Sequence, residues 1–212
     1  MLDHIISYFQ TSSDRFWTML AEHLRISALS LLAAVLIAVP AGYLCVRFGH
    51  AKKYVTGFFN VLRVIPSLAV LLLILPLLGT GTGPAMVALV LLAIPPILMN
   101  TVAGLESVPA FMLETAAGMG MKPQQIWTRV RTPLALPLLL TGVKTAAVEI
   151  IASATLAAKI GAGGLGDLIF TGIGLFRTDL LLIGGVTVAL LSLTTGLLFG
   201  LADRLFLKYK TA

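Results

Sequence analysis

The residues of this chain that could do chemistry are few, and no familiar catalytic pattern is complete. Gly161-x-Gly163-x-x-Gly166 matches a dinucleotide-binding turn letter for letter, but that turn needs a preceding β-strand, and an apolar run of membrane-spanning length precedes it here. Asp167 follows directly, as in proteases that use two intramembrane aspartates, yet no other apolar run holds an aspartate in its interior. Because such enzymes divide acid and base work between two carboxylates, we predict no catalytic site.

Nucleotide and metal sites are equally absent from the sequence. No G-x-x-x-x-G-K-[ST] motif occurs, and the three histidines His4, His23 and His50 are scattered without the spacing of metal ligands. The single cysteine, Cys45, excludes an internal disulfide. We therefore expect neither a metal nor a cofactor in this chain.

Three charged residues lie inside long apolar runs: Arg63, Lys144 and Glu149. Charges within a membrane are costly and by default mark functional positions. Arg63 lies near enough to one surface for its side chain to reach water. Lys144 and Glu149 are about 140° apart on a helix of 3.6 residues per turn, so they do not face each other. We take Pro66, Asn100, Lys144 and Glu149 as candidates to line a pathway through the membrane; pairing between subunits is the structural alternative.

The amino-acid composition of the chain indicates a membrane protein. Of 212 residues, 58% are hydrophobic and 11% are charged, whereas a soluble domain carries roughly 25% charged residues. The unbroken apolar runs exclude a β-barrel, whose strands alternate between polar and apolar residues. The fold class expected is an all-α integral membrane protein.

The apolar runs predict five transmembrane helices, since about 20 residues cross a bilayer. The spans are expected near residues 26–46, 55–78, 85–104, 134–158 and 180–202, with the turn residues Gly79–Pro84 separating the second from the third. Prolines inside these spans, among them Pro40, Pro76, Pro95 and Pro96, predict bent helices. Bending suits a pathway, although bent packing alone would also explain it.

The basic residues predict an orientation. Nine lie on one face (Arg47, Lys52, Lys53, Lys122, Arg129, Arg131, Arg204, Lys208 and Lys210) and four on the other (Arg15, Arg25, Lys159 and Arg177). The positive-inside rule puts the richer face in the cytosol. The C-terminus would then be cytosolic, and the N-terminus and the connection 159–179 would face outward.

The chain divides into three parts on this basis. Residues 1–24 form an extracytoplasmic lead-in, either an amphipathic helix on the membrane surface or a loose polar segment. Residues 25–206 form the transmembrane domain, and residues 207–212 a basic cytosolic tail. The outward connection contains Gly161, Gly163, Gly164, Gly166 and Asp167, which we interpret as a flexible loop that lets helices approach closely.

The segment 107–133 is the longest polar and basic interruption of the apolar sequence. Ser107 can cap a helix whose first turn holds Pro109, Gly118 and Gly120 end it, and Pro123 can begin a second short helix. Two short helices at an angle form a knob that could enter a groove on a soluble partner. Composition alone favours a helix lying on lipid headgroups instead.

The same segment resembles the ATPase-coupling loop of binding-protein-dependent ABC-importer permeases. That loop reads E-A-A, three residues, G, nine residues, I-x-L-P; Glu114, Ala116, Gly120, Val130 and Pro133 fall in register with it, and Thr115 and Thr132 depart from it. Residues 63–68 resemble the family's second-span entry. Residues 154–167 resemble the outward connection of the glycine betaine, choline and carnitine branch, to which the methionine branch is related. The resemblance covers most of residues 20–205.

The resemblance implies a pore subunit that works with other proteins. Two permease chains, identical or paralogous, would pair in the bacterial cytoplasmic membrane, an extracytoplasmic binding protein would deliver the solute, and ATP and Mg²⁺ would be bound by a separate ATPase. Glu114, Thr115, Ala116, Ala117, Gly120, Val130 and Pro133 would contact the ATPase. Gly120 would allow the sharp turn, and Glu114 would be a polar anchor.

Several functions remain open, and each requires different features of the sequence. The first is a permease subunit of an ATP-driven importer for glycine betaine, carnitine or choline, and the second is the same machine for another solute such as methionine. A membrane-embedded enzyme needs facing catalytic groups, and a channel needs no ATPase-coupling loop. Quaternary ammonium ions are bound by aromatic cages; since the chain is only 8% aromatic with no cluster in its spans, the cage is expected on the binding protein.

Overall fold

The computed structural model describes residues 2–49 and 52–206, and these residues form helices with no strand among them. The elements are α1 (Leu2–Arg47), α2 (Lys52–Leu62), α3 (Ser67–Leu78), α4 (Thr82–Glu106), α5 (Ala110–Gly118), α6 (Pro123–Ile126), the π-helix η1 (Trp127–Arg131), α7 (Thr132–Ala157), the 3₁₀ turn η2 (Ala158–Ile160), α8 (Leu165–Gly174) and α9 (Thr178–Phe206). The all-α membrane fold predicted from the sequence is confirmed. The basic tail 207–212 lies outside the described residues.

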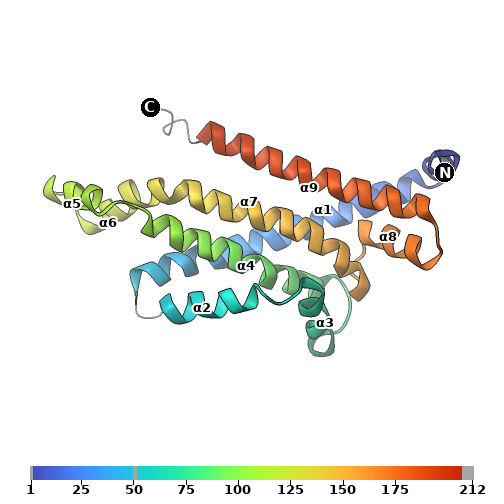
Figure 1. Cartoon of the computed structure of the whole chain (residues 1–212), viewed down its shortest axis with the longest axis horizontal. Helices are drawn as coiled ribbons and strands as arrows, with labels where there is room; N and C mark the ends of the chain where they lie inside the picture. The colour runs from blue at the N-terminus through green and yellow to red at the C-terminus, as the bar shows by residue number, and fades with distance from the viewer. Residues whose placement is uncertain (1, 50–51, 207–212) are drawn as a thin grey trace.

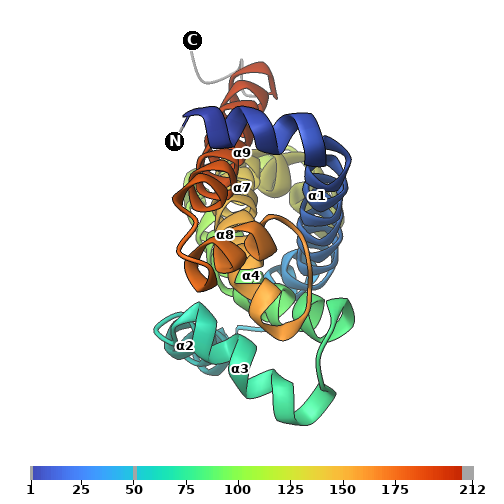
Figure 2. The ribbon, with the colours of Figure 1, turned by 90° about the vertical axis from the view of Figure 1, so that its right-hand side faces the viewer.

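Four long helices, α1, α4, α7 and α9, run along the length of the molecule (Figure 1). The short helices α5 and α6 lie at one end, and the N-terminus and α8 lie at the other. Four helices are long and apolar enough to cross a membrane, and the count becomes five if α2 and α3 form one broken span. Figure 2 shows the bundle from the end that carries the N-terminus.

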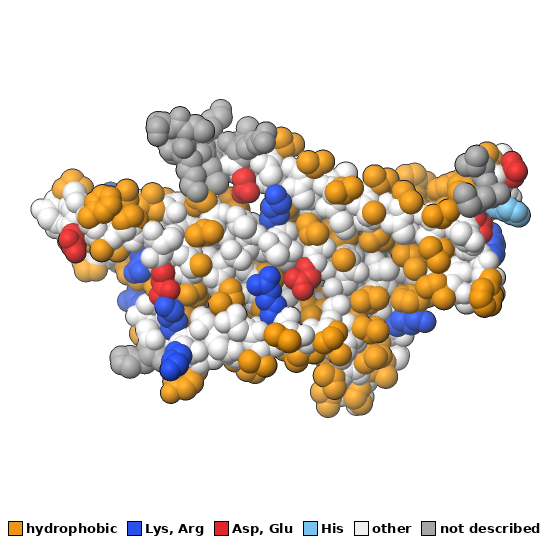
Figure 3. Space-filling view, in the orientation of Figure 1, with side chains coloured by type: hydrophobic (Ala, Val, Ile, Leu, Met, Phe, Trp, Pro, Cys, Tyr) orange, Lys and Arg blue, Asp and Glu red, His pale blue; other side chains and the backbone are white. Residues whose placement is uncertain are grey.

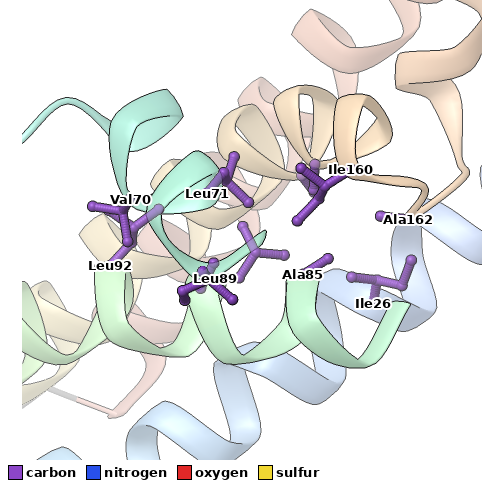
Figure 4. Packing of buried hydrophobic residues seen from close by; sticks show 12 residues of the cluster. Ile26, Val70, Leu71, Ala85, Leu89, Leu92, Ile160 and Ala162 are labelled. Atoms are coloured by element: carbon purple, nitrogen blue, oxygen red, sulfur yellow. The ribbon is translucent and has the colours of Figure 1, made fainter. Parts of the chain in front are cut away.

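Helix α4 is the centre of the bundle. Of its most apolar stretch 67% is buried inside the chain, whereas only 17% of the corresponding stretch of α9 is buried. Beside α4, Ile26 of α1, Leu71 of α3 and Ile160 of η2 pack around Leu89 (Figure 4). Helix α9 therefore keeps most of its apolar surface for lipid or for another protein.

Small residues set the distance between α4 and α7. Lipid tails are as apolar as leucine, so membrane helices associate through close packing rather than through exclusion of water. A Cβ atom on Gly142 of α7 would lie 2.7 Å from Cβ of Asn100 and 2.9 Å from the carbonyl oxygen of Pro96. On Gly104 of α4 it would lie 2.8 Å from the carbonyl oxygen of Ala135. The two backbones are thus as close as glycine permits.

The second predicted span, near residues 55–78, is a broken span in the structure, as the proline within it leads one to expect. Helices α2 and α3 meet at an angle of 99°, and Pro66, with extended backbone angles (φ −56°, ψ 137°), stands just before α3. Proline has no N–H for the helix ladder, and it disfavours helical geometry in the residue before it. The break at residues 63–66 follows from that proline.

The N-terminal segment is helical. Helix α1 joins two helices across a kink at Ser12 (φ −138°, ψ 22°), and the second of them runs past the predicted first span to Arg47. Residues 2–11 are therefore a helical segment that turns away from the rest of α1 at Ser12, as Figure 2 shows.

The packing of α4 against α7 leads to a stability prediction. Gly142→Ala introduces a Cβ where backbone and side-chain atoms already stand, and overpacking of this kind costs about 1–3 kcal/mol. We expect a lower thermal unfolding midpoint of the chain in detergent. Gly185→Ala on α9, where a Cβ meets nothing within 4 Å, is the matched control and should keep the midpoint of the parent. Equal midpoints for the two variants would contradict this packing.

Candidate functional site

The segment 107–133 folds as a short exposed helix followed by a tight turn. Ser107 is not the cap of this helix, as the sequence suggested; it ends α4, where its hydroxyl donates to the carbonyl of Gly104 at 2.9 Å. Pro109 stands at the start of α5. The cause is Pro109. Proline disfavours helical geometry in the residue before it, so α5 begins only after Pro109 and Ser107 remains at the end of α4.

The end of α5 depends on Gly120. Its φ is +81°, a region that residues with a Cβ rarely adopt. Around this turn the N–H of Met119 donates to Thr115, that of Gly120 to Ala117 and that of Met121 to Ala116. The last carbonyls of the helix are thereby satisfied, and the chain reverses toward α6 within a few residues.

The outer surface of this segment is free within the chain. Glu114, Thr115, Ala117 and Gly120 are exposed, and Ala116 is buried against the rest of the segment. Exposed apolar side chains stand beside them: Phe111 is 62% exposed and Met119 is 72% exposed. A knob with a polar carboxylate and large apolar side chains fits a groove on a partner protein.

The knob is tied to the long helices by Trp127. The guanidinium of Arg131 lies 4.4 Å from the centre of the Trp127 ring, and the Tyr43 ring of α1 packs on the same indole at 4.7 Å between centres. Nε of Arg131 also donates to the carbonyl of Leu105 at 2.8 Å. We name Tyr43, Trp127, Arg131 and Leu105 the tryptophan clasp; it joins η1 to α1 and to the last turn of α4.

Sequence reasoning missed the clasp. The spacing of Trp127 and Arg131, four residues apart on a helix, is a signal that could have found one half of it. Tyr43 lies far away in the sequence, so nothing in the local pattern shows its contact with the indole.

The second short helix continues into the fourth span. Helix α6, η1 and α7 follow one another directly, with Val130 half-buried and Pro133 exposed in the first turn of α7. A proline ring inside an α-helix collides with the carbonyl four residues earlier. The wider π turn before it gives that ring room, and the Thr132 hydroxyl donates to the carbonyl of Trp127 at 2.8 Å.

Two of the four pathway candidates line one cavity. Glu149 of α7 and Pro66, at the break of the second span, face a cavity of about 290 Å³, together with Arg63 and the buried Ser153. The sequence could not place Arg63 here, because its position depends on the angle of the break between α2 and α3.

The other two pathway candidates lie elsewhere. The Asn100 amide donates to the carbonyl of Pro96 one turn earlier on its own helix, at 2.8 Å. The Lys144 ammonium approaches α9, where it lies 3.7 Å from the position of a Cβ on Gly200. The four candidates therefore do not form one site within this chain.

The outward glycine-rich connection is shorter than expected. Gly161, Gly163 and Gly164 have φ between +76° and +82°, but α8 begins at Leu165, so Gly166 and Asp167 belong to a helix and not to a loop. A Cβ on Gly166 would lie 2.1 Å from the carbonyl oxygen of Thr155. The close approach of helices that the sequence suggested is thus present at this glycine.

Glu22 of α1 fixes this connection from across the bundle. Its carboxylate accepts the N–H of Gly164 at 3.2 Å. Burial raises the pKa of the nearby Asp167 carboxyl, and the Glu22 charge raises it further, while Arg15 opposes both. The glycine-rich turn is therefore tied to α1, as the coupling segment is tied to α1 at the other end.

Comparison with known proteins places these features in a family. Residues 17–208 match the family described as the binding-protein-dependent transport system inner membrane component. The carnitine transport permease protein OpuCB of Listeria monocytogenes is 40% identical over 199 residues, covering 94% of this chain and 91% of that protein. The choline transport system permease protein OpuBB of Bacillus subtilis is 36% identical, covering 96% and 94%. The osmoprotectant import permease protein OsmY of Salmonella typhimurium is 41% identical over 175 residues, covering 81% and 74%.

Solved structures share the fold. An inward-facing structure of the MetNI methionine ABC transporter aligns with a TM-score of 0.81 and 24% identity, covering 90% of this chain and 95% of that one. A crystal structure of an amino acid ABC transporter with histidines aligns with a TM-score of 0.78 and 20% identity, covering 94% and 97%. Taken with the match over residues 17–208, these similarities show that the chain belongs to the binding-protein-dependent transport system inner membrane component family, the membrane permeases of ABC importers.

Proposed function

We propose that this chain is the transmembrane pore subunit of an ATP-driven importer for quaternary-ammonium osmoprotectants such as glycine betaine, carnitine and choline. Relatives 36–41% identical to it are named for carnitine, for choline and for osmoprotectant import. The structural likeness to a methionine transporter, at 24% identity, supports the fold and not the cargo. Methionine or another solute is the alternative that an uptake measurement separates.

The single observation that carries the proposal is an exposed helix joined to the membrane bundle by a fixed contact. Helix α5 presents Glu114 and neighbouring apolar side chains outward, and the tryptophan clasp connects its supporting turn to α1 and α4. A separate ATPase that binds ATP and Mg²⁺ would bind this helix. Closure of the ATPase would move the clasp and tilt the long helices between inward-open and outward-open states.

A second permease copy or a paralogue would cover part of the apolar surface. Leucines on α3 are strongly exposed, with Leu73 at 63% and Leu77 at 79%, and Figure 3 shows hydrophobic side chains covering that lobe. Helix α9 is the other weakly covered helix of the bundle. These surfaces suit a membrane protein that pairs with another across a central pathway.

The pathway itself would pass the cavity beside Glu149 and Pro66. The described lining of this cavity holds one carboxylate, Glu149, and one guanidinium, Arg63, and has no aromatic cage that would hold a quaternary ammonium ion tightly. Specific recognition would then belong to an extracytoplasmic binding protein. In this arrangement the coupling segment faces the cytosol of the bacterial inner membrane, as the basic residues predict.

Uptake by the assembled complex tests the cargo. The chain is expressed in a cell that lacks its own osmoprotectant importers, with its ATPase and binding protein, and accumulation of radiolabelled betaine, carnitine, choline and methionine is measured. We expect ATP-dependent accumulation of at least one quaternary ammonium compound and none of methionine. Accumulation of methionine alone would overturn the proposed substrate class, while the permease assignment would stand.

The turn at Gly120 gives a mutational prediction. Gly120→Val places a β-branched residue at a φ of +81°, where a Cβ costs about 1–2 kcal/mol. We expect the variant to reach the membrane at the parent's level but to lose uptake, because α5 no longer presents its surface correctly.

Gly118→Val is the matched control, since Gly118 lies in α5 and a Cβ there meets nothing within 4 Å. This variant should retain more uptake than Gly120→Val. Full uptake in the Gly120→Val variant would count against the coupling role of this turn.

A further inference from the structure

A polar cavity lies at the end of the bundle opposite the coupling segment. It measures about 370 Å³ and is enclosed by the first helical segment of α1, by α8 and by the start of α9. His4, Tyr8 and Thr11 line it from α1, on one helical face. Residues 2–11 lie across this end of the bundle (Figure 2), so the cavity depends on the turn at Ser12.

Two arginines, Arg15 and Arg177, line the cavity, and none of the described residues that line it is a carboxylate. Nε and Nη2 of Arg177 both donate to the Asp179 carboxylate, which balances most of the Arg177 charge. The guanidinium of Arg15 makes no ion pair among the described residues, so it supplies the unbalanced positive charge of the wall. Guanidinium groups bind phosphate and carboxylate through paired N–H donors.

A buried hydroxyl in the same wall has no partner. Tyr8 is 9% exposed, and its Oη makes no hydrogen bond among the described residues. A buried polar group without a partner costs free energy. An anion in the cavity would accept this hydroxyl and the Arg15 guanidinium together.

An apolar groove adjoins the cavity. Ile5 and Phe9 of α1 and Leu182, Ile183 and Val186 of α9 enclose about 330 Å³ with almost no polar atoms. Tyr8 lines the polar cavity and Phe9 the groove, and these consecutive rings lie 5.7 Å apart between centres. The first turns of α9 also contribute to both, through Leu180 and Leu182.

We propose that this end of the bundle binds one anionic phospholipid, with its phosphate beside Arg15, Arg177 and the Tyr8 hydroxyl and an acyl chain in the groove between α1 and α9. A soluble anion would use the polar cavity only and would leave the groove uncovered. A phospholipid matches both parts, since it joins a phosphate to apolar chains. Because α1 and α9 are membrane-spanning helices, their ends lie where lipid headgroups are found.

The lipid would have a structural effect. It would hold residues 2–11 against α8 and α9. Within the chain, α1, α8 and α9 already meet at this end in one buried cluster, which consists of Tyr8, Phe16, Met19, Leu165, Leu168, Leu180 and Ile183. The inference concerns this end of the chain alone and does not depend on the solute that the importer carries.

The experiment titrates the full-length chain, purified in neutral detergent, with dioleoyl phosphatidylglycerol and counts bound lipid by native mass spectrometry. We expect one lipid that survives detergent washing. Arg15→Gln should weaken its binding about 10-fold, because a charge-assisted contact is lost, and Tyr8→Phe about 3-fold or more, because one hydrogen bond is lost. Lys159→Gln is the matched control, since Lys159 contacts Phe170 near the same end without lining the cavity; its binding should equal the parent's.

Three further ligands separate the sources of the anion. Dioleoylglycerol lacks the phosphate, while inorganic phosphate and glycerophosphoglycerol lack the acyl chains, and each should bind at least 10-fold more weakly than the whole lipid. Equal binding of glycerophosphoglycerol and phosphatidylglycerol would overturn the lipid proposal in favour of a soluble-anion site. So would unchanged lipid binding in both Arg15→Gln and Tyr8→Phe. Absence of bound lipid, with Arg15→Gln weakening the capture of the binding protein instead, would assign the cavity to that partner and also overturn the proposal.

Discussion

The contact of Trp127 with Tyr43 and Arg131 is the interaction on which the proposed mechanism depends. The continuous run of α6, η1 and α7 already joins the segment to α7; this contact adds the link to α1 and α4 that the proposed mechanism requires. The indole lies between a ring from α1 and a guanidinium that also holds the last turn of α4. Since α4 is the most buried of the long helices, the proposed mechanism would carry a displacement of the knob to the centre of the fold.

The bundle itself combines close packing with a broken span. Glycines at positions 104 and 142 let α4 and α7 approach until backbone atoms limit the distance. Close packing of this kind holds the two helices at a fixed separation. The break at Pro66 interrupts this regularity and opens the cavity that holds Arg63, Glu149 and Ser153. Ser153 is buried there, Glu149 is half-buried and Arg63 is exposed, and the backbone N–H groups of residues 63–65 donate to carbonyls of α2, as irregular backbone at membrane depth requires.

Much of the fold follows from the sequence, because long apolar runs can only be membrane helices. The first, third and fifth predicted spans lie within α1, α4 and α9, and the fourth lies within α7 except for its last residue, Ala158, which begins η2. The expected start of α6 at Pro123 is confirmed. The bend of the second span at Pro66 could be expected from the proline, but the angle of 99° between α2 and α3 could not, because hydrophobicity carries no information about direction. The end of the glycine-rich loop was misplaced because Gly166 serves close helix packing, which looks the same in sequence as a flexible turn.

The sites were less predictable than the fold. Glu114 and Gly120 were named from their register with the family's loop, and the structure places them on one short helix and its turn; their role stays a prediction. Tyr43 and Ser153 could not, because they meet Trp127 and Pro66 only through tertiary packing. Lys144 and Glu149 were predicted not to face each other. In the structure Lys144 approaches α9, whereas Glu149 lines the cavity at the broken span.

The most direct test measures ATP hydrolysis and uptake together in proteoliposomes that contain the complete importer with Trp127→Leu. Removing the indole leaves the surface of α5 unchanged but takes away the ring that joins Tyr43 to Arg131. The account predicts that the ATPase still co-purifies with the permease and still hydrolyses ATP, while solute uptake per ATP falls about 10-fold or more, as expected when a contact worth roughly 1.4 kcal/mol or more is lost from the moving state. An unchanged ratio of uptake to hydrolysis would contradict the claim that the tryptophan clasp transmits the movement.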